Sequence, residues 1–170
     1  MDKKNPVLSI VTTGYKWLIL GGNLLQPLIL LTFRLNWGRQ FFTNGKGKLT
    51  DHQSIVEYFS SLHIPAPDLN AWFVGGVECF GGLLLLVGLA SRPIALMLTT
   101  SMSVAYLADP DERAKVLNLF HDQDSFLQAD PFFFWLTALL VLAFGPGRIS
   151  VDALLQRFVF KKQAARSDEG

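Results

Sequence analysis

The chain has 170 residues, of which 50% are hydrophobic and only 17% are charged, and its mean hydropathy is +0.31. Soluble domains of this size are more polar, so the composition indicates a membrane protein of one domain. The formal charge of +1 argues against a nucleic-acid-binding protein, and the single cysteine, Cys79, excludes an internal disulfide.

Apolar stretches predict a lead-in helix followed by four membrane spans. The lead-in helix falls within residues 1–24, is mildly amphipathic, and is expected to lie at the membrane interface. The predicted spans are residues 25–42, 69–90, 93–108 and 131–144. The last two are shorter than the ~20 residues that cross a bilayer core, so we expect their ends to extend into the loops. Residues 25–147 form the predicted transmembrane domain, and residues 148–170 form a basic tail that we expect to be frayed at its end.

Each of the two outer loops contains a predicted short amphipathic helix. Asp51 is a good N-cap for a helix whose Ile55 and Phe59 share one face. Asp109 and Pro110 open the second such helix. The predicted fold class is therefore all-α: a polytopic four-transmembrane-helix bundle with short helices resting on its outer side.

Basic residues orient the predicted bundle. With four spans both termini share one side, which carries nine Lys and Arg, while the other two loops carry four. The first set is Lys3, Lys4, Lys16, Arg92, Arg148, Arg157, Lys161, Lys162 and Arg166, and the second is Lys46, Lys48, Arg113 and Lys115. By the positive-inside rule both termini are predicted to be cytoplasmic, in a bacterial inner membrane.

Two charges interrupt the predicted spans. Glu78 lies in the glycine-rich second span, and Arg34 lies in the first, with Arg39 nearer its outer end. Arg34 is eight residues before Phe42, and Glu78 is nine residues after Leu69. At ~1.5 Å per residue both lie at a similar depth near the midplane, so we predict a buried Arg34–Glu78 pair.

Two interpretations of this pair stay open. It could fix the register of two antiparallel helices, because an isolated charge in hydrocarbon is costly. It could instead form a polar pocket, open to the outer leaflet, that holds a quinone head, a proton or a small anion. Metal binding has weaker support: His121, Asp122 and Asp124 in the outer acidic loop are suitable ligand types without a recognised spacing.

The chain resembles the DoxX family of small bacterial membrane proteins. The resemblance rests on Leu31-Thr32-Phe33-Arg34-Leu35, Glu57-Tyr58-Phe59, Ile64-Pro65, Glu78 with Gly81-Gly82-Leu83-Leu84-Leu85, Gly88-Leu89, Ser91-Arg92 and Phe144-Gly145-Pro146-Gly147-Arg148. Where the family commonly has glycine before Ile-Pro, this chain has His63. The resemblance implies a four-helix membrane bundle, with Arg34, Lys48, Glu78 and Arg92 as its charged pattern residues.

The resemblance implies an accessory or redox-associated subunit of a membrane oxidoreductase or maturation system. Quinone is the candidate ligand, no covalently bound cofactor is expected, and a protein partner would carry any redox centre or substrate. A small-solute or ion permease and a purely structural anchor for a partner remain alternatives. No catalytic motif is visible in the sequence, so whether the chain is an enzyme, and its oligomeric state, stay open.

Overall fold

The structure, a computed structural model, describes residues 6–158 and, for the first helix, side chains from residue 11 onward. These residues are mainly helical and contain no strand, which confirms the predicted all-α class. The helices are α1 (Pro6–Thr50), α2 (His52–Ser61), α3 (Pro67–Val87), α4 (Ser91–Ala108), α5 (Pro110–Leu117), α6 (Gln123–Leu127) and α7 (Phe132–Phe144). A final helical stretch begins at residue 151 and continues through residue 158. The predicted fraying of the tail concerns residues outside the described part.

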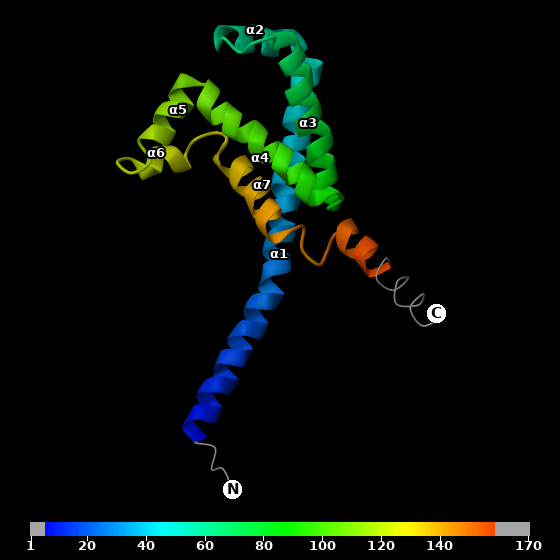
Figure 1. Cartoon of the computed structure of the whole chain (residues 1–170), viewed down its shortest axis with the longest axis vertical. Coiled ribbons are helices and arrows are strands. Elements are labelled where there is room, and N and C mark those ends of the chain that lie inside the picture. Colours follow the sequence, from blue (N-terminus) through cyan, green and yellow to red (C-terminus); the bar gives the residue numbers. More distant parts are fainter. Residues whose placement is uncertain (1–5, 159–170) are drawn as a thin grey trace, which may run out of the picture.

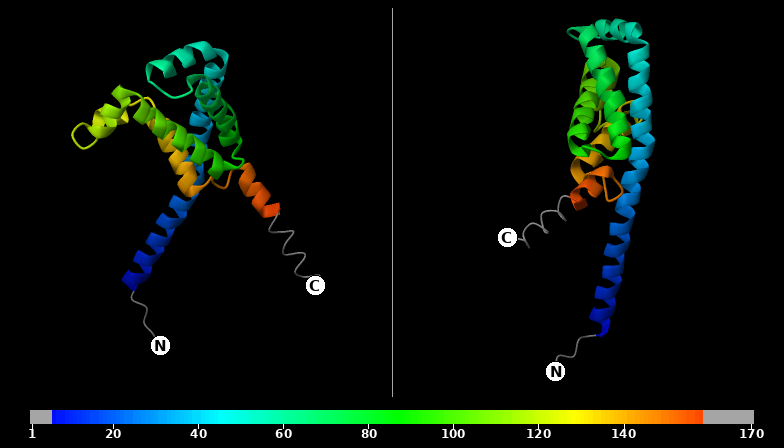
Figure 2. Two further views of the ribbon diagram at one scale, coloured as in Figure 1. Left: turned by 45° about the horizontal axis from the view of Figure 1, so that its top comes forward. Right: turned by 90° about the vertical axis from the view of Figure 1, so that its right-hand side faces the viewer.

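The first helix is much longer than predicted. Residues 6–50 form one α-helix with Pro27 inside it, so no break separates a lead-in helix from a first span near residue 24. Its 45 residues extend about 68 Å at ~1.5 Å per residue, roughly twice a bilayer core. Helix-breaking residues such as Pro27 are tolerated in apolar helices of this kind. The N-terminal part of α1 extends beyond the other helices (Figures 1 and 2).

Four helices pack around one core. α1 contacts α3 and α7, and α4 contacts the same two helices, so the four close a ring. Phe41, Leu85, Leu98 and Val141 are fully buried at its centre, one from each helix. The Trp37 ring stacks on Phe133 at 5.2 Å between centroids and tightens the α1–α7 contact. The short helices α2, α5 and α6 lie at one end of this ring, opposite Pro6 and Phe158 (Figure 1).

By length and apolar composition, two helices in the described part can cross a membrane. They are Val11–Thr50, within α1, and Pro67–Val87, which is α3. α4 has 18 residues, two more than predicted, and α7 has 13, so the expectation that the ends of both spans extend into the loops is wrong for α7. The side chains of α1 and α3 that face away from the ring are large, apolar and exposed, among them Leu35, Phe73 and Phe80. Such a surface is suited to lipid rather than water.

Glycines bring α1 and α3 into close contact. A Cβ atom placed on Gly45 would lie 2.7 Å from Cys79 Cα, and one on Gly82 would lie 2.8 Å from the carbonyl oxygen of Gly38. Neither position has room for a side chain, as at other closely packed membrane helices. On α3, Gly75, Gly81 and Gly82 all face close neighbours, whereas Gly76 has open space beside it.

Gly45→Ala is therefore expected to destabilise the fold. The added methyl group must push α1 from the α3 backbone, which costs about 1–3 kcal/mol in an overpacked core. Unfolding in mixed detergent and SDS micelles, followed by circular dichroism, measures the loss. Gly47→Ala is the matched control, because nothing lies within 4 Å of its Cβ position. Equal stability of the two variants would contradict the close contact.

His63 adopts a backbone conformation that favours glycine. Its φ is 57°, in the left-handed region, at the turn between α2 and α3. This explains physically why glycine suits the position before Ile64-Pro65. His63→Gly is expected to raise the free energy of unfolding by about 1 kcal/mol, since a non-glycine residue costs ~1–2 kcal/mol there. A lower midpoint in the same SDS titration would show that the imidazole contributes more than the strain removes.

Candidate functional site

A cavity of about 590 Å³ opens between α2, α3 and α4. Its walls are mainly apolar, and one ion pair interrupts them. The apolar walls are Ile55, Phe59, Leu62, Ile64, Phe73, Val74, Val77, Leu96, Met97, Val104, Ala105 and Ala108, and the polar side chains are Lys48, Tyr58, Asn70, Glu78, Thr100 and Ser101. Cavities of this size, apolar with few polar groups, are typical of small-molecule sites.

The charged group of this cavity is a Lys48–Glu78 ion pair. Lys48 Nζ donates a hydrogen bond to Glu78 Oε1. The Glu78 side chain is 2% exposed and the Lys48 side chain 27%, so the carboxylate is enclosed and the ammonium group reaches the cavity. The close approach of Gly45 to the α3 backbone at Cys79 holds the two helices at this register. Burying both charges together avoids an uncompensated charge among apolar side chains.

The predicted pairing of Arg34 with Glu78 is wrong. Both residues are buried, at 1% exposure each, but their side chains have different partners. We had predicted a similar depth for Arg34 and Glu78 with the outer end of the first span at Phe42, whereas α1 continues as a helix to Thr50. These eight further residues move that end by about 12 Å. Lys48, in this added part of the helix, is therefore the residue that meets Glu78.

Arg34 instead binds four backbone carbonyl groups. Its Nε donates to Leu85 O at 2.9 Å and its Nη2 to Leu86 O at 3.0 Å, both at the C-terminal end of α3. Its Nη1 donates to Pro146 O and to Ile149 O, the latter at 3.0 Å. A cation suits the C-terminus of a helix, where free carbonyls carry partial negative charge. Arg34 thus ties α1, α3 and the segment after α7 together.

Gly88 shows how tightly this arginine is enclosed. A Cβ atom at Gly88 would lie 2.8 Å from Arg34 Cζ, and Gly88 ends α3 with a φ of 71°. Asp152 lies close by: its carboxylate accepts hydrogen bonds from Ala90 N and Ser91 N, each at 2.8 Å. Burial alone would raise the pKa of Asp152, but these hydrogen bonds and the charge of Arg34 lower it.

The remaining predicted site residues lie elsewhere. Arg39 is exposed on α1, and Arg92 lies at the start of α4, at the opposite end from the Lys48–Glu78 cavity. Asp122 accepts hydrogen bonds from Ser125 and caps α6. Within residues 6–158 no three His, Cys, Asp or Glu side chains come close enough to hold a metal ion, so His121 and Asp124 have no such arrangement with Asp122.

The sequence did not indicate Tyr58 or Ser101 as site residues. Tyr58 OH, on α2, donates to Asp109 Oδ2 at the end of α4 at 2.8 Å, so this bond joins two walls of the cavity. Ser101 lines the cavity, and its hydroxyl has no hydrogen-bond partner among the described residues. The available signal was the Glu57-Tyr58-Phe59 motif, which could not reveal a partner 51 positions away.

The Tyr58–Asp109 bond predicts a measurable titration. The hydrogen bond to Asp109, followed by burial and the charges of Asp109, Glu112 and Asp111, raises the pKa of Tyr58 to about 12. The neutral phenol is the donor, so the stabilisation is complete below the ordinary pKa and is lost as pH rises through about 12. Phenolate absorbance of the parent minus that of Tyr58→Phe measures this midpoint.

Asp109→Asn is expected to move the Tyr58 midpoint back toward 10.0. Asparagine is a suitable control because it preserves the helix cap: Asp109 Oδ1 accepts from Asp111 N, and Asn caps about as well as Asp. An unchanged midpoint in Asp109→Asn would show that Tyr58 is not bonded to this carboxylate.

The structure first indicates the class of protein to which the chain belongs. Two helices that can cross a bilayer, exposed apolar flanks and an ion pair enclosed by apolar walls describe a membrane-associated helical protein. The DoxX family model matches residues 29–109, from α1 to the end of α4. This match covers just under half of the chain, and the resemblance inferred from the sequence is confirmed.

One curated relative carries a name that refers to oxidoreductase chemistry. A Bacillus subtilis (strain 168) protein named "Putative oxidoreductase CatD" is 26% identical over 72 residues. The match covers 42% of this chain and 52% of that protein, so it spans about half of the relative's length. No solved structure matches the chain.

Proposed function

We propose that this chain is a four-span protein of the bacterial cytoplasmic membrane and a redox-associated accessory subunit of a membrane oxidoreductase. In this arrangement α1, α3, α4 and α7 cross the bilayer and both termini are cytoplasmic. The ring of four helices, with Pro6 and Phe158 at the same end, supports an even number of crossings. The similarity to a protein named as an oxidoreductase supports the redox association.

The apolar cavity containing Lys48 and Glu78 carries this proposal. We assign it to the headgroup of a membrane quinone, whose ring is apolar and whose carbonyl oxygens accept hydrogen bonds. Lys48 has three N–H donors and uses one on Glu78, so it can donate to a carbonyl oxygen. The unpartnered Ser101 hydroxyl provides a second donor. A bound quinone would supply two-electron chemistry, and a partner would supply the other redox centre.

Binding of a short-chain ubiquinone analogue to the purified protein tests this assignment. The parent is expected to bind in dodecyl maltoside micelles, and Ser101→Ala is expected to bind about fivefold more weakly, since one hydrogen bond is lost. Lys46→Gln is the control, because Lys46 is exposed on α1 two residues from Lys48 and does not line the cavity. A parent protein without saturable quinone binding overturns the quinone assignment.

A second function, anchoring a partner protein, is favoured by the first half of α1. This segment lies outside the four-helix ring and exposes Trp17, Leu18, Leu24 and Leu25. If a partner helix covers it, the partner co-purifies from the native membrane with the parent and is lost from a Trp17→Gln, Leu24→Gln variant. A parent protein that purifies alone in a functional state counts against this anchor.

A further inference from the structure

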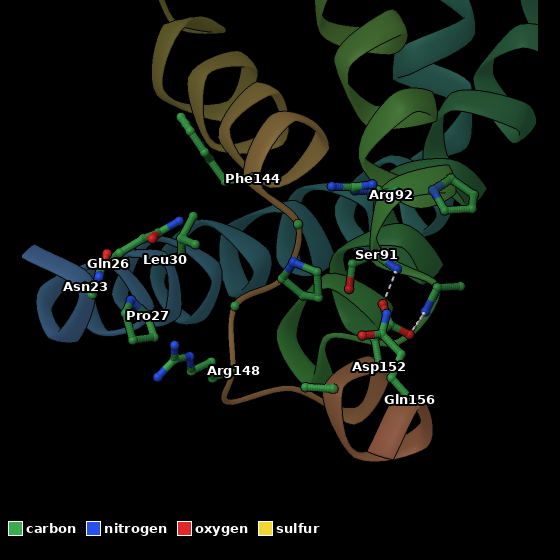
Figure 3. A pocket seen from close by; sticks show the side chains of 16 residues that line it. Asn23, Gln26, Pro27, Leu30, Ser91, Arg92, Phe144, Arg148, Asp152 and Gln156 are labelled. Carbon is green, nitrogen blue, oxygen red and sulfur yellow. Dashed lines mark hydrogen bonds between the residues drawn. The ribbon is translucent and has the colours of Figure 1, made fainter. Parts of the chain in front are cut away.

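A second cavity, of about 630 Å³, lies at the end of the helix ring opposite α2 (Figure 3). It is enclosed by α1 around residues 23–30, by the start of α4, and by the segment that follows α7. The side chains that matter for its chemistry are Gln26, Leu30, Arg92, Phe144, Arg148 and Asp152. It shares no lining residue with the Lys48–Glu78 cavity.

The cationic groups of this cavity are free to bind a ligand. Arg92 and Arg148 lie on either side of the Gly145–Gly147 connection (Figure 3), and neither forms an ion pair or a side-chain hydrogen bond within the described residues. The carboxylate in the cavity, Asp152, is already occupied by Ala90 N and Ser91 N and lies near Arg34. Two guanidinium groups therefore remain for an anion, and their planar forks suit a phosphate group.

An apolar surface continues from the mouth of the cavity. Phe144, which lines the cavity at the end of α7, is 60% exposed. Leu30, which lines the inner part of the cavity, is 3% exposed. Cationic groups beside exposed hydrocarbon match a phospholipid, whose glycerol backbone carries a phosphate on one side and acyl chains on the other.

We propose that this cavity binds the headgroup of an anionic phospholipid, with Arg92 and Arg148 contacting its phosphate. The acyl chains lie along Phe144, and the Gln26 amide faces the glycerol part of the headgroup. The site lies at the end of the helix ring at which both ends of the described chain lie (Figure 1). This binding is independent of quinone and goes beyond the proposed redox association.

Retention of phosphatidylglycerol by the full chain, measured by native mass spectrometry in nonionic detergent, tests the lipid site. The parent is expected to bind phosphatidylglycerol at least about tenfold more tightly than phosphatidylcholine, because the choline ammonium group of phosphatidylcholine competes with the two arginines for the phosphate that both lipids carry. Arg92→Gln with Arg148→Gln removes this preference. Arg39→Gln with Arg113→Gln is the matched control, because it removes the same charge from two exposed arginines outside the cavity.

Several results would overturn the proposal. They are equal retention of the two lipids by the parent, an equal loss of preference in both double variants, and complete displacement of the lipid by millimolar inorganic phosphate. The last result would identify a site for a free anion. Arg148→Gln alone keeps the test decisive if the double variant does not fold, because Arg148 is exposed: it must reduce the preference for phosphatidylglycerol over phosphatidylcholine.

Discussion

Arg34→Met is expected to destabilise the protein by about 3–5 kcal/mol. The substitution removes the Arg34 donor from the carbonyl groups of Leu85, Leu86, Pro146 and Ile149, of which the first contact is buried and the other three are partly buried. Each buried unpaired polar group costs about 1–3 kcal/mol, and partial relaxation toward the membrane surface keeps the total below the simple sum. The measurement is the unfolding midpoint in mixed dodecyl maltoside and SDS micelles.

Two further variants define the cause of this loss. Arg34→Lys retains the charge but cannot reach four carbonyl groups lying in the directions of a planar fork, so it is expected to recover only part of the stability. Arg39→Met, five residues further along the exposed side of α1, is the control and should change stability by less than about 0.5 kcal/mol. If Arg34→Met is as stable as Arg39→Met, the carbonyl contacts do not hold the bundle together.

Arg34 also shows what the sequence could reveal about this site. A charge in an apolar helix predicted correctly that the side chain is buried and needs partners. It could not reveal that the partners are main-chain carbonyl groups, because every residue carries one and none leaves a signal in the sequence. The segment after α7 supplies two of them, at separations of 112 and 115 residues.

Helix boundaries were predictable only where the chain has a strong stop. α3 and α4 begin within two residues of their predicted starts, since Pro67 and the Gly88–Ala90 turn mark these positions. The end of α1 was missed because Thr43, Asn44, Gly45 and Gly47 resemble a turn. In the structure Gly45 lies where α1 and α3 touch, and tertiary packing overrides its low helix propensity. That misplaced end produced the wrong partner for Glu78.

Lys48→Met is expected to produce the second large effect, a loss of about 3–5 kcal/mol. It removes the cation beside a carboxylate whose side chain is 2% exposed, and breaking one half of a buried ion pair costs about this much. Lys46→Met is the control for the loss of a positive charge on α1, since Lys46 is exposed. Unfolding in SDS micelles compares the two variants, and equal midpoints would mean that Glu78 does not depend on Lys48.

The double variant Lys48→Met with Glu78→Leu separates a structural pair from a functional one. Replacing both charges by apolar groups of similar volume is often neutral or stabilising, so the double variant should recover most of the stability lost by Lys48→Met. If the pair only fixes helix register, quinone binding returns with stability. If Lys48 contacts the quinone headgroup, the double variant is stable and still binds the quinone analogue at least about tenfold more weakly than the parent. Comparing stability with binding in one protein therefore decides between the two roles of the buried pair.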